Sequence, residues 1–141
     1  MQGGSRWLGT RGCCMGRQIP RGAEVLLEPF GERPPRVGEL AAYLRSGELA
    51  VHRLCRRDAD GWWANPDARI IVERTGPLIG RVRLLRHRGR LQSLPARPGR
   101  AQLAWLLNRV YLRLRGRLPL AALRGWFFSR LMRLKLGPLS S

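Results

Sequence analysis

Apolar residues alternate with polar ones, or form short runs, over the first two thirds of the chain, and turn-forming residues separate the runs. Residues 23–29 alternate after a Pro-Arg-Gly turn and end at the Pro/Gly-rich stretch 31–38. Residues 39–57 give two apolar runs around Ser46-Gly47, which is a hairpin signal. Glu, Leu and Ala at the start of this segment also suit a helix, but the neighbouring strand-like segments favour strands.

The strand-like pattern continues through residues 58–73, which contain a turn, a tryptophan pair, a second turn and an apolar run. Residues 77–90 then alternate, with Val82 and Leu84 expected to face inward. Short strands with frequent turns are typical of antiparallel sheets. The sequence therefore predicts a mainly β fold, with an antiparallel β module over residues 9–90.

The hydrophobic period changes beyond residues 94–99, a stretch rich in proline that we interpret as a linker. Apolar residues then follow helical spacing in two runs, with a break at residues 115–119. The runs are Leu103, Leu106, Leu107, Val110 and Leu114, then Leu120, Leu123, Phe127, Leu131 and Leu134. We predict a basic amphipathic helical hairpin over residues 100–136. Its apolar stripe should either cover an open face of the β module, which we favour, or contact an anionic membrane.

Charge is unevenly distributed along the 141 residues, whose net charge is +18. All nine acidic residues lie between Glu24 and Glu73, whereas fifteen arginines, Lys135 and no acid follow from Arg74 onward. Such a tail can attract nucleic acid or anionic lipid. A nucleic-acid-binding function would rest on charge alone, because no nucleic-acid-binding motif is recognised, and we rank it last.

Three cysteines, Cys13, Cys14 and Cys55, are an odd number without a secretory pattern around them, so we expect reduced thiols. No apolar stretch approaches the length of a transmembrane helix or of a signal peptide core. We therefore expect a cytoplasmic protein whose contact with a membrane, if any, is peripheral. We expect no metal and no organic cofactor.

Only two histidines, His52 and His87, could act as a base near neutral pH. His52 lies in an apolar run, where its side chain needs a partner, while His87 stands among arginines. His52 could pair with the thiol of Cys14 as base and nucleophile, with Asp67 orienting the imidazole. Both His52 and Cys14 also have an ordinary structural explanation. His52 could be a hydrogen-bonded structural histidine, and Cys14 a small core residue. We expect His87 and Cys55 to be bystanders.

The segment CMGRQIPRGAEVLLEP, which begins at Cys14, resembles the nucleophile box of type I signal peptidases and of the related self-cleaving repressors. Cys14 stands at the position of the nucleophilic serine, and Met15, Ile19, Gly22 and Val25 match the pattern. The pieces RVGELAAY, LAVHRL, NPDA and LIGRVRLL then resemble, in the expected order, the later motifs of members that use histidine as base. The resemblance covers residues 9–86.

This resemblance implies a signal peptidase-like β fold and an endopeptidase that hydrolyses a peptide bond in a precursor or leader peptide. The lysine base of many members is excluded within the β module, because the single lysine is Lys135. A catalytically inactive peptide-binding relative of the same fold is the alternative, since cysteine replaces the serine. The implied site consists of Cys14 as nucleophile, His52 as base and Asp67 as orienting group, with Met15, Gly16 and Ile19 binding substrate.

Overall fold

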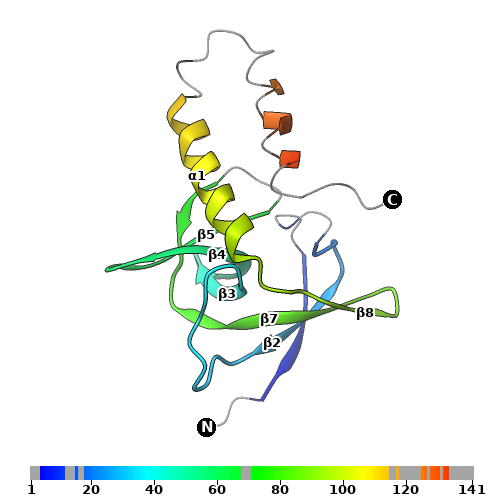
Figure 1. The fold of residues 1–141 in the computed structure, drawn as a ribbon. Coiled ribbons are helices and arrows are strands. Elements are labelled where there is room, and N and C mark those ends of the chain that lie inside the picture. The colour runs from blue at the N-terminus through cyan, green and yellow to red at the C-terminus, as the bar shows by residue number, and fades with distance from the viewer. Residues whose placement is uncertain are drawn as a thin grey trace.

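The computed structural model describes residues 4–11, 15, 18–67, 71–114, 117, 125–126, 128–130 and 132–133 (Figure 1). The strands are β1 (Arg6–Gly9), β2 (Glu24–Glu28), β3 (Leu40–Arg45), β4 (Glu48–Asp58), β5 (Gly61–Asn65), β6 (Glu73–Arg74), β7 (Leu78–His87) and β8 (Arg90–Ser93). They are followed by helix α1 (Pro98–Leu114). The predicted mainly β fold with a C-terminal helical element is confirmed.

All strand pairs in the sheet are antiparallel, and the strand order is β1-β2-β7-β3-β4-β5-β6, with β8 paired to β7. Strand β7 therefore lies between β2 and β3 in the sheet, although it follows both of them in the sequence. By pairing with β2 on one side and β3 on the other, β7 connects the N-terminal strands to the β3–β4 hairpin. Strand β1 was not predicted from the sequence, because its four residues are too few for a period to be recognised.

The β3–β4 hairpin turns through two residues, Ser46 and Gly47, between the paired Arg45 and Glu48. Both turn residues have positive φ, 51° for Ser46 and 82° for Gly47, as a type I′ hairpin turn requires. Because this turn directs the chain straight back along itself, residues 40–45 form a strand. The hairpin prediction is confirmed and the helical alternative for this segment is wrong.

Strand β7 corrects one prediction about the core. Val82 is buried as expected, but Leu85 rather than Leu84 is its buried companion. The pairing of β2 with β7 shifts between Leu26 and Leu27, which face Leu84 and Val82. The additional residue in β7 at this bulge reverses the alternation of inward and outward side chains, which a simple period of two cannot anticipate.

Two groups of buried apolar side chains form the core. One comprises Met15, Ile19, Ala23, Val25, Leu40, Val82, Leu85 and Leu94, and the other comprises Ala41, Tyr43, Leu54 and Ala64. Met15 and Ile19 come from the segment between β1 and β2, so this connection is anchored in the first core group. Met15 and Ile19 are thereby fixed against the sheet.

Helix α1 contacts β4 and β5 and extends away from the sheet (Figure 1). The side chains that it buries are Ala101, Ala104 and Asn108, and the Asn108 amide donates a hydrogen bond to the carbonyl oxygen of Ile71 at 3.4 Å. The expectation that the leucine stripe covers the β module is therefore wrong for α1. Residues 125–126, 128–130 and 132–133 are also helical, while the rest of the second predicted run lies outside the described residues.

Gly38, just before β3, packs against the backbone at the start of α1. We expect its replacement by alanine to destabilise the fold strongly. Its φ is +89°, and a Cβ atom would lie 2.4 Å from the backbone nitrogen of Pro98. Gly47→Ala is the matched control, because Gly47 also has positive φ but open space around the Cβ position. We expect Gly38→Ala to lower the free energy of unfolding by about 2–4 kcal/mol, and Gly47→Ala by about 1 kcal/mol. Urea denaturation measures both, and equal losses would contradict the backbone contact.

Candidate active site

A cavity of about 430 Å³ lies between the end of β1, the 15–25 segment and the β3–β4 hairpin. Its lining is mixed: apolar side chains predominate, and the polar part includes His52 and the charged residues Arg11, Arg45 and Glu48. Met15 and Ile19, both predicted to bind substrate, also line it. The structure thus brings three predicted site residues to one cavity. Cys14 and Gly16 lie outside the described residues.

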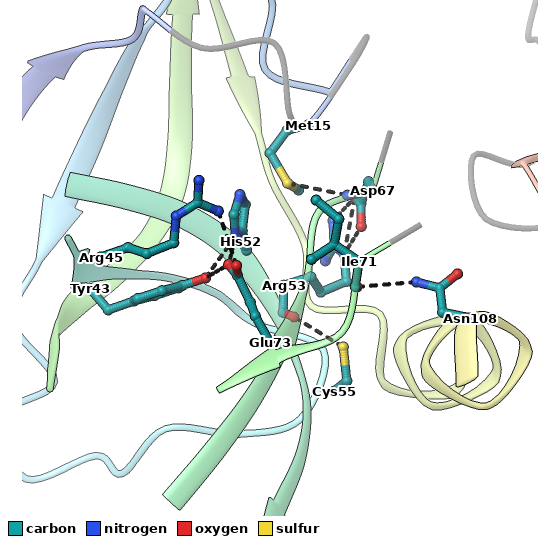
Figure 2. Close-up of polar contacts among 10 residues, drawn as sticks. All are labelled: Met15, Tyr43, Arg45, His52, Arg53, Cys55, Asp67, Ile71, Glu73 and Asn108. Carbon is teal, nitrogen blue, oxygen red and sulfur yellow. Dashed lines mark hydrogen bonds and ion pairs between the residues drawn. The ribbon is translucent and has the colours of Figure 1, made fainter. Parts of the chain in front are cut away.

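Strand β4 directs His52 into a buried polar cluster with Tyr43 and Glu73 (Figure 2). The His52 Nδ1 atom is 2.7 Å from Glu73 Oε1 and 2.7 Å from the Tyr43 hydroxyl. The Tyr43 hydroxyl also donates to Glu73, and Arg45 Nη1 donates to the other carboxylate oxygen at 3.0 Å. Because Tyr43 uses its proton on Glu73, the same carboxylate accepts the Nδ1 proton of His52. The Nε2 atom is then the unprotonated nitrogen of a neutral imidazole.

The protonation states in this cluster follow from burial and charge. Burial lowers the pKa of His52, and the nearby carboxylate of Glu73 offsets only part of that effect. Burial alone would raise the pKa of Glu73, but hydrogen bonds from Tyr43 and His52 and the charges of His52 and Arg45 lower it overall. Burial, with Glu73 beside it, raises the pKa of Tyr43. Near neutral pH the cluster therefore holds a neutral imidazole beside an ionised carboxylate.

Asp67 does not make the contact that the sequence analysis assigned to it. Its carboxylate accepts hydrogen bonds from Arg53 Nε at 3.2 Å and Nη2 at 3.0 Å, and both side chains are buried. Adjacent residues on a strand point to opposite faces, so β4 directs His52 toward Glu73 and Arg53 toward Asp67 (Figure 2). The carboxylate that orients His52 is therefore Glu73.

Arg53 also connects the β module to the segment that follows the predicted nucleophile. It donates to the Gln18 side-chain oxygen, and to the carbonyl oxygen of Gly38 at 2.7 Å. On the other side of the ion pair, the backbone N–H of Asp67 donates to the Met15 sulfur at 3.5 Å. The Arg53 side chain thus holds Gln18, and the backbone of Asp67 holds Met15.

Glu73 was missed because it belongs to none of the motifs in which the resemblance was recognised, whereas Tyr43 ends the piece RVGELAAY but was assigned no role by that resemblance. A sequence signal exists for both in retrospect. Glu73 ends an apolar run, and Tyr43 lies in the buried half of β3, where a polar group needs a partner. The predicted bystander Cys55 is buried, and its thiol donates to the carbonyl oxygen of Arg53. His87 ends β7, and neither residue is among those described as lining the cavity.

Comparison with known proteins gives no family assignment. No protein-family model matches the chain, and no curated protein matches its sequence. Among the described residues, no helix has the length and apolar character needed to cross a bilayer.

Stability should fall as the pH decreases below the ordinary pKa of histidine, 6.5. The folded state lowers the pKa of His52, so the unfolded chain takes up its proton first, and stability is lost as the pH falls toward the folded-state pKa. Urea denaturation at about pH 7.5 and about pH 5.5 measures this loss. His52→Gln should show a smaller loss over the same interval. An equal loss in both proteins would contradict a buried neutral imidazole.

Proposed function

We propose that this protein is a signal peptidase-like cysteine endopeptidase that cleaves an extended precursor or leader peptide. Cys14 is the nucleophile, His52 is the general base and Glu73 orients the imidazole. The observation that carries the proposal is the contact between His52 and Glu73 at a cavity that Met15 also lines. Met15 follows Cys14 directly in the sequence, which supports the proposal that Cys14 acts at the cavity that His52 lines.

The chemistry requires a base that is neutral near physiological pH, and the lowered pKa of His52 meets that need. Nε2 accepts the proton of the Cys14 thiol, and the sulfur attacks the carbonyl carbon of the scissile bond. The tetrahedral intermediate collapses to a thioester, and the imidazolium returns the proton to the leaving amine. Water, deprotonated by Nε2, then hydrolyses the thioester and regenerates the thiol. The ionised Glu73 stabilises the imidazolium in both steps.

An extended, apolar peptide segment suits the site. Leu8, Val25 and Val51 are among the cavity-lining residues, so a small or medium apolar side chain would lose water contact on binding. Strand β1 pairs with β2 and occupies an edge of the described sheet. Its other side can pair with an added peptide strand, as in other proteins that recognise extended peptides.

A peptide mixture of broad sequence composition, analysed by mass spectrometry after incubation with the protein, tests this function. We expect new peptide termini with the wild-type chain and with Cys13→Ala, and none with Cys14→Ala. Because the two cysteines are adjacent, Cys13→Ala controls for the loss of a thiol from this segment. Cleavage that survives in Cys14→Ala would contradict the nucleophile. Peptide binding without any cleavage by the wild-type chain would show an inactive binding protein instead.

A further inference from the structure

The side of α1 that faces away from the sheet carries an apolar stripe exposed to solvent. Its members, Leu103, Leu106, Val110 and Leu114, are 45%, 53%, 37% and 38% exposed. Their spacing of three and four residues places them on one face of the helix. The helix buries Ala101, Ala104 and Asn108 against the sheet instead. Four large apolar side chains thus form an outer surface that stays substantially exposed in the part of the chain that the structure describes.

This outer stripe is surrounded by positive charge. Arg100, Arg109 and Arg113 belong to the same helix, and no acidic residue occurs after Glu73. Fifteen arginines and Lys135 lie from Arg74 onward. A second copy of the chain would bring the same positive charge to the stripe and be repelled. Nucleic acid would pair with the arginines but would leave the leucines exposed to water.

Both properties fit the surface of an anionic bilayer. A helix that lies in the headgroup region inserts its apolar face toward the acyl chains, and its basic residues contact anionic headgroups. Trp126 and Phe128 are exposed at 60% and 42%, and the Phe128 ring packs against Tyr111 of α1 with their centroids 6.5 Å apart. Aromatic side chains of this kind are favoured at the membrane interface.

We propose that α1 binds the surface of anionic membranes through Leu103, Leu106, Val110 and Leu114. The opposite side of the helix stays docked on β4 and β5, so binding leaves the β module folded and attached. This inference does not depend on the proposed peptidase activity. An anionic membrane supplies both an apolar phase for the exposed stripe and negative charge for the arginines around it.

Flotation of the full chain with phosphatidylglycerol–phosphatidylcholine vesicles tests the proposal. We expect binding at about 0.1 M salt that weakens about tenfold or more at about 0.5 M salt. The double substitution Leu106→Gln and Val110→Gln should weaken it at least about tenfold. The matched control, Ile79→Gln with Leu91→Gln, removes two exposed apolar side chains from β7 and β8 and should leave binding within about twofold.

Several results would overturn the proposal. Equal binding by the stripe variant would show that charge alone holds the protein on the vesicle. Equal binding to vesicles of pure phosphatidylcholine would exclude recognition of anionic lipid, and no binding to either vesicle would exclude the membrane altogether. Dimerisation in sedimentation that is abolished by the stripe substitutions would identify a second copy as the partner. Circular dichroism and thermal melts identical to wild type establish that each variant is folded.

Discussion

Glu73→Gln should lower kcat/KM for peptide cleavage about 10³- to 10⁴-fold while leaving the protein folded. In the wild-type cluster Glu73 accepts the Nδ1 proton of His52, which leaves Nε2 as the base. A glutamine amide can instead donate to Nδ1, and the proton of the neutral imidazole then resides on Nε2. The base is lost although the side chain keeps its size, and the developing imidazolium loses its counter-charge.

The pH profile separates this role from a structural one. Glu73 raises the pKa of His52, so its neutralisation should move the acidic limb of kcat/KM to lower pH. The control is Glu24→Gln, which removes a carboxylate that pairs with Arg86 on β7, outside the polar cluster of His52. We expect the control to retain the cleavage rate and pH profile of the wild-type protein. A Glu73→Gln variant that cleaves peptide with an unchanged acidic limb would contradict the proposed role of Glu73 in orienting His52.

Arg53→Met should lower the free energy of unfolding by about 3–5 kcal/mol, because it leaves the Asp67 carboxylate buried without its partner. It also removes the hydrogen bonds to Gln18 and to the carbonyl oxygen of Gly38. Natural domains are stable by only about 5–15 kcal/mol. The variant should therefore be close to unfolding, and urea denaturation measures the loss.

Two controls show whether the loss comes from the buried charge. Arg86→Met breaks the exposed pair with Glu24, whose side chains are about half exposed, and should leave the urea denaturation midpoint close to that of the wild type. Combining Arg53→Met with Asp67→Leu removes the unpaired carboxylate and should restore a large part of the stability. A double variant as unstable as the sum of the single variants would contradict the ion pair as the cause.

The sequence predicts the parts of this fold that local patterns determine. Alternation and the Ser46-Gly47 turn were sufficient for the β3–β4 hairpin, because a two-residue turn of positive φ fixes its register. The bulge that leaves Leu85 buried in place of Leu84 arises where β7 pairs with β2, a strand far away in the sequence. Local alternation contains no information about such a pairing.

The same distinction applies to α1 and to the candidate site. Helical spacing located the leucine stripe, but only the tertiary contacts show that Ala101, Ala104 and Asn108 form the docked side. His52 was found because it is a rare titratable group in an apolar run. Its carboxylate could not be chosen from the sequence, since the choice between Asp67 and Glu73 depends on which face of β4 each one meets.

The proposed pair of Cys14 and His52 is tested most directly by the rate at which each cysteine is alkylated by iodoacetamide at neutral pH. Fragment mass spectrometry assigns the label to Cys13, Cys14 or Cys55. We expect Cys14 to react about tenfold or more faster than Cys13, since a neighbouring imidazole that accepts its proton increases the thiolate fraction. This advantage should disappear in folded His52→Gln. Equal rates at Cys13 and Cys14, or a rate at Cys14 that does not change when His52 is replaced, would contradict the catalytic pair.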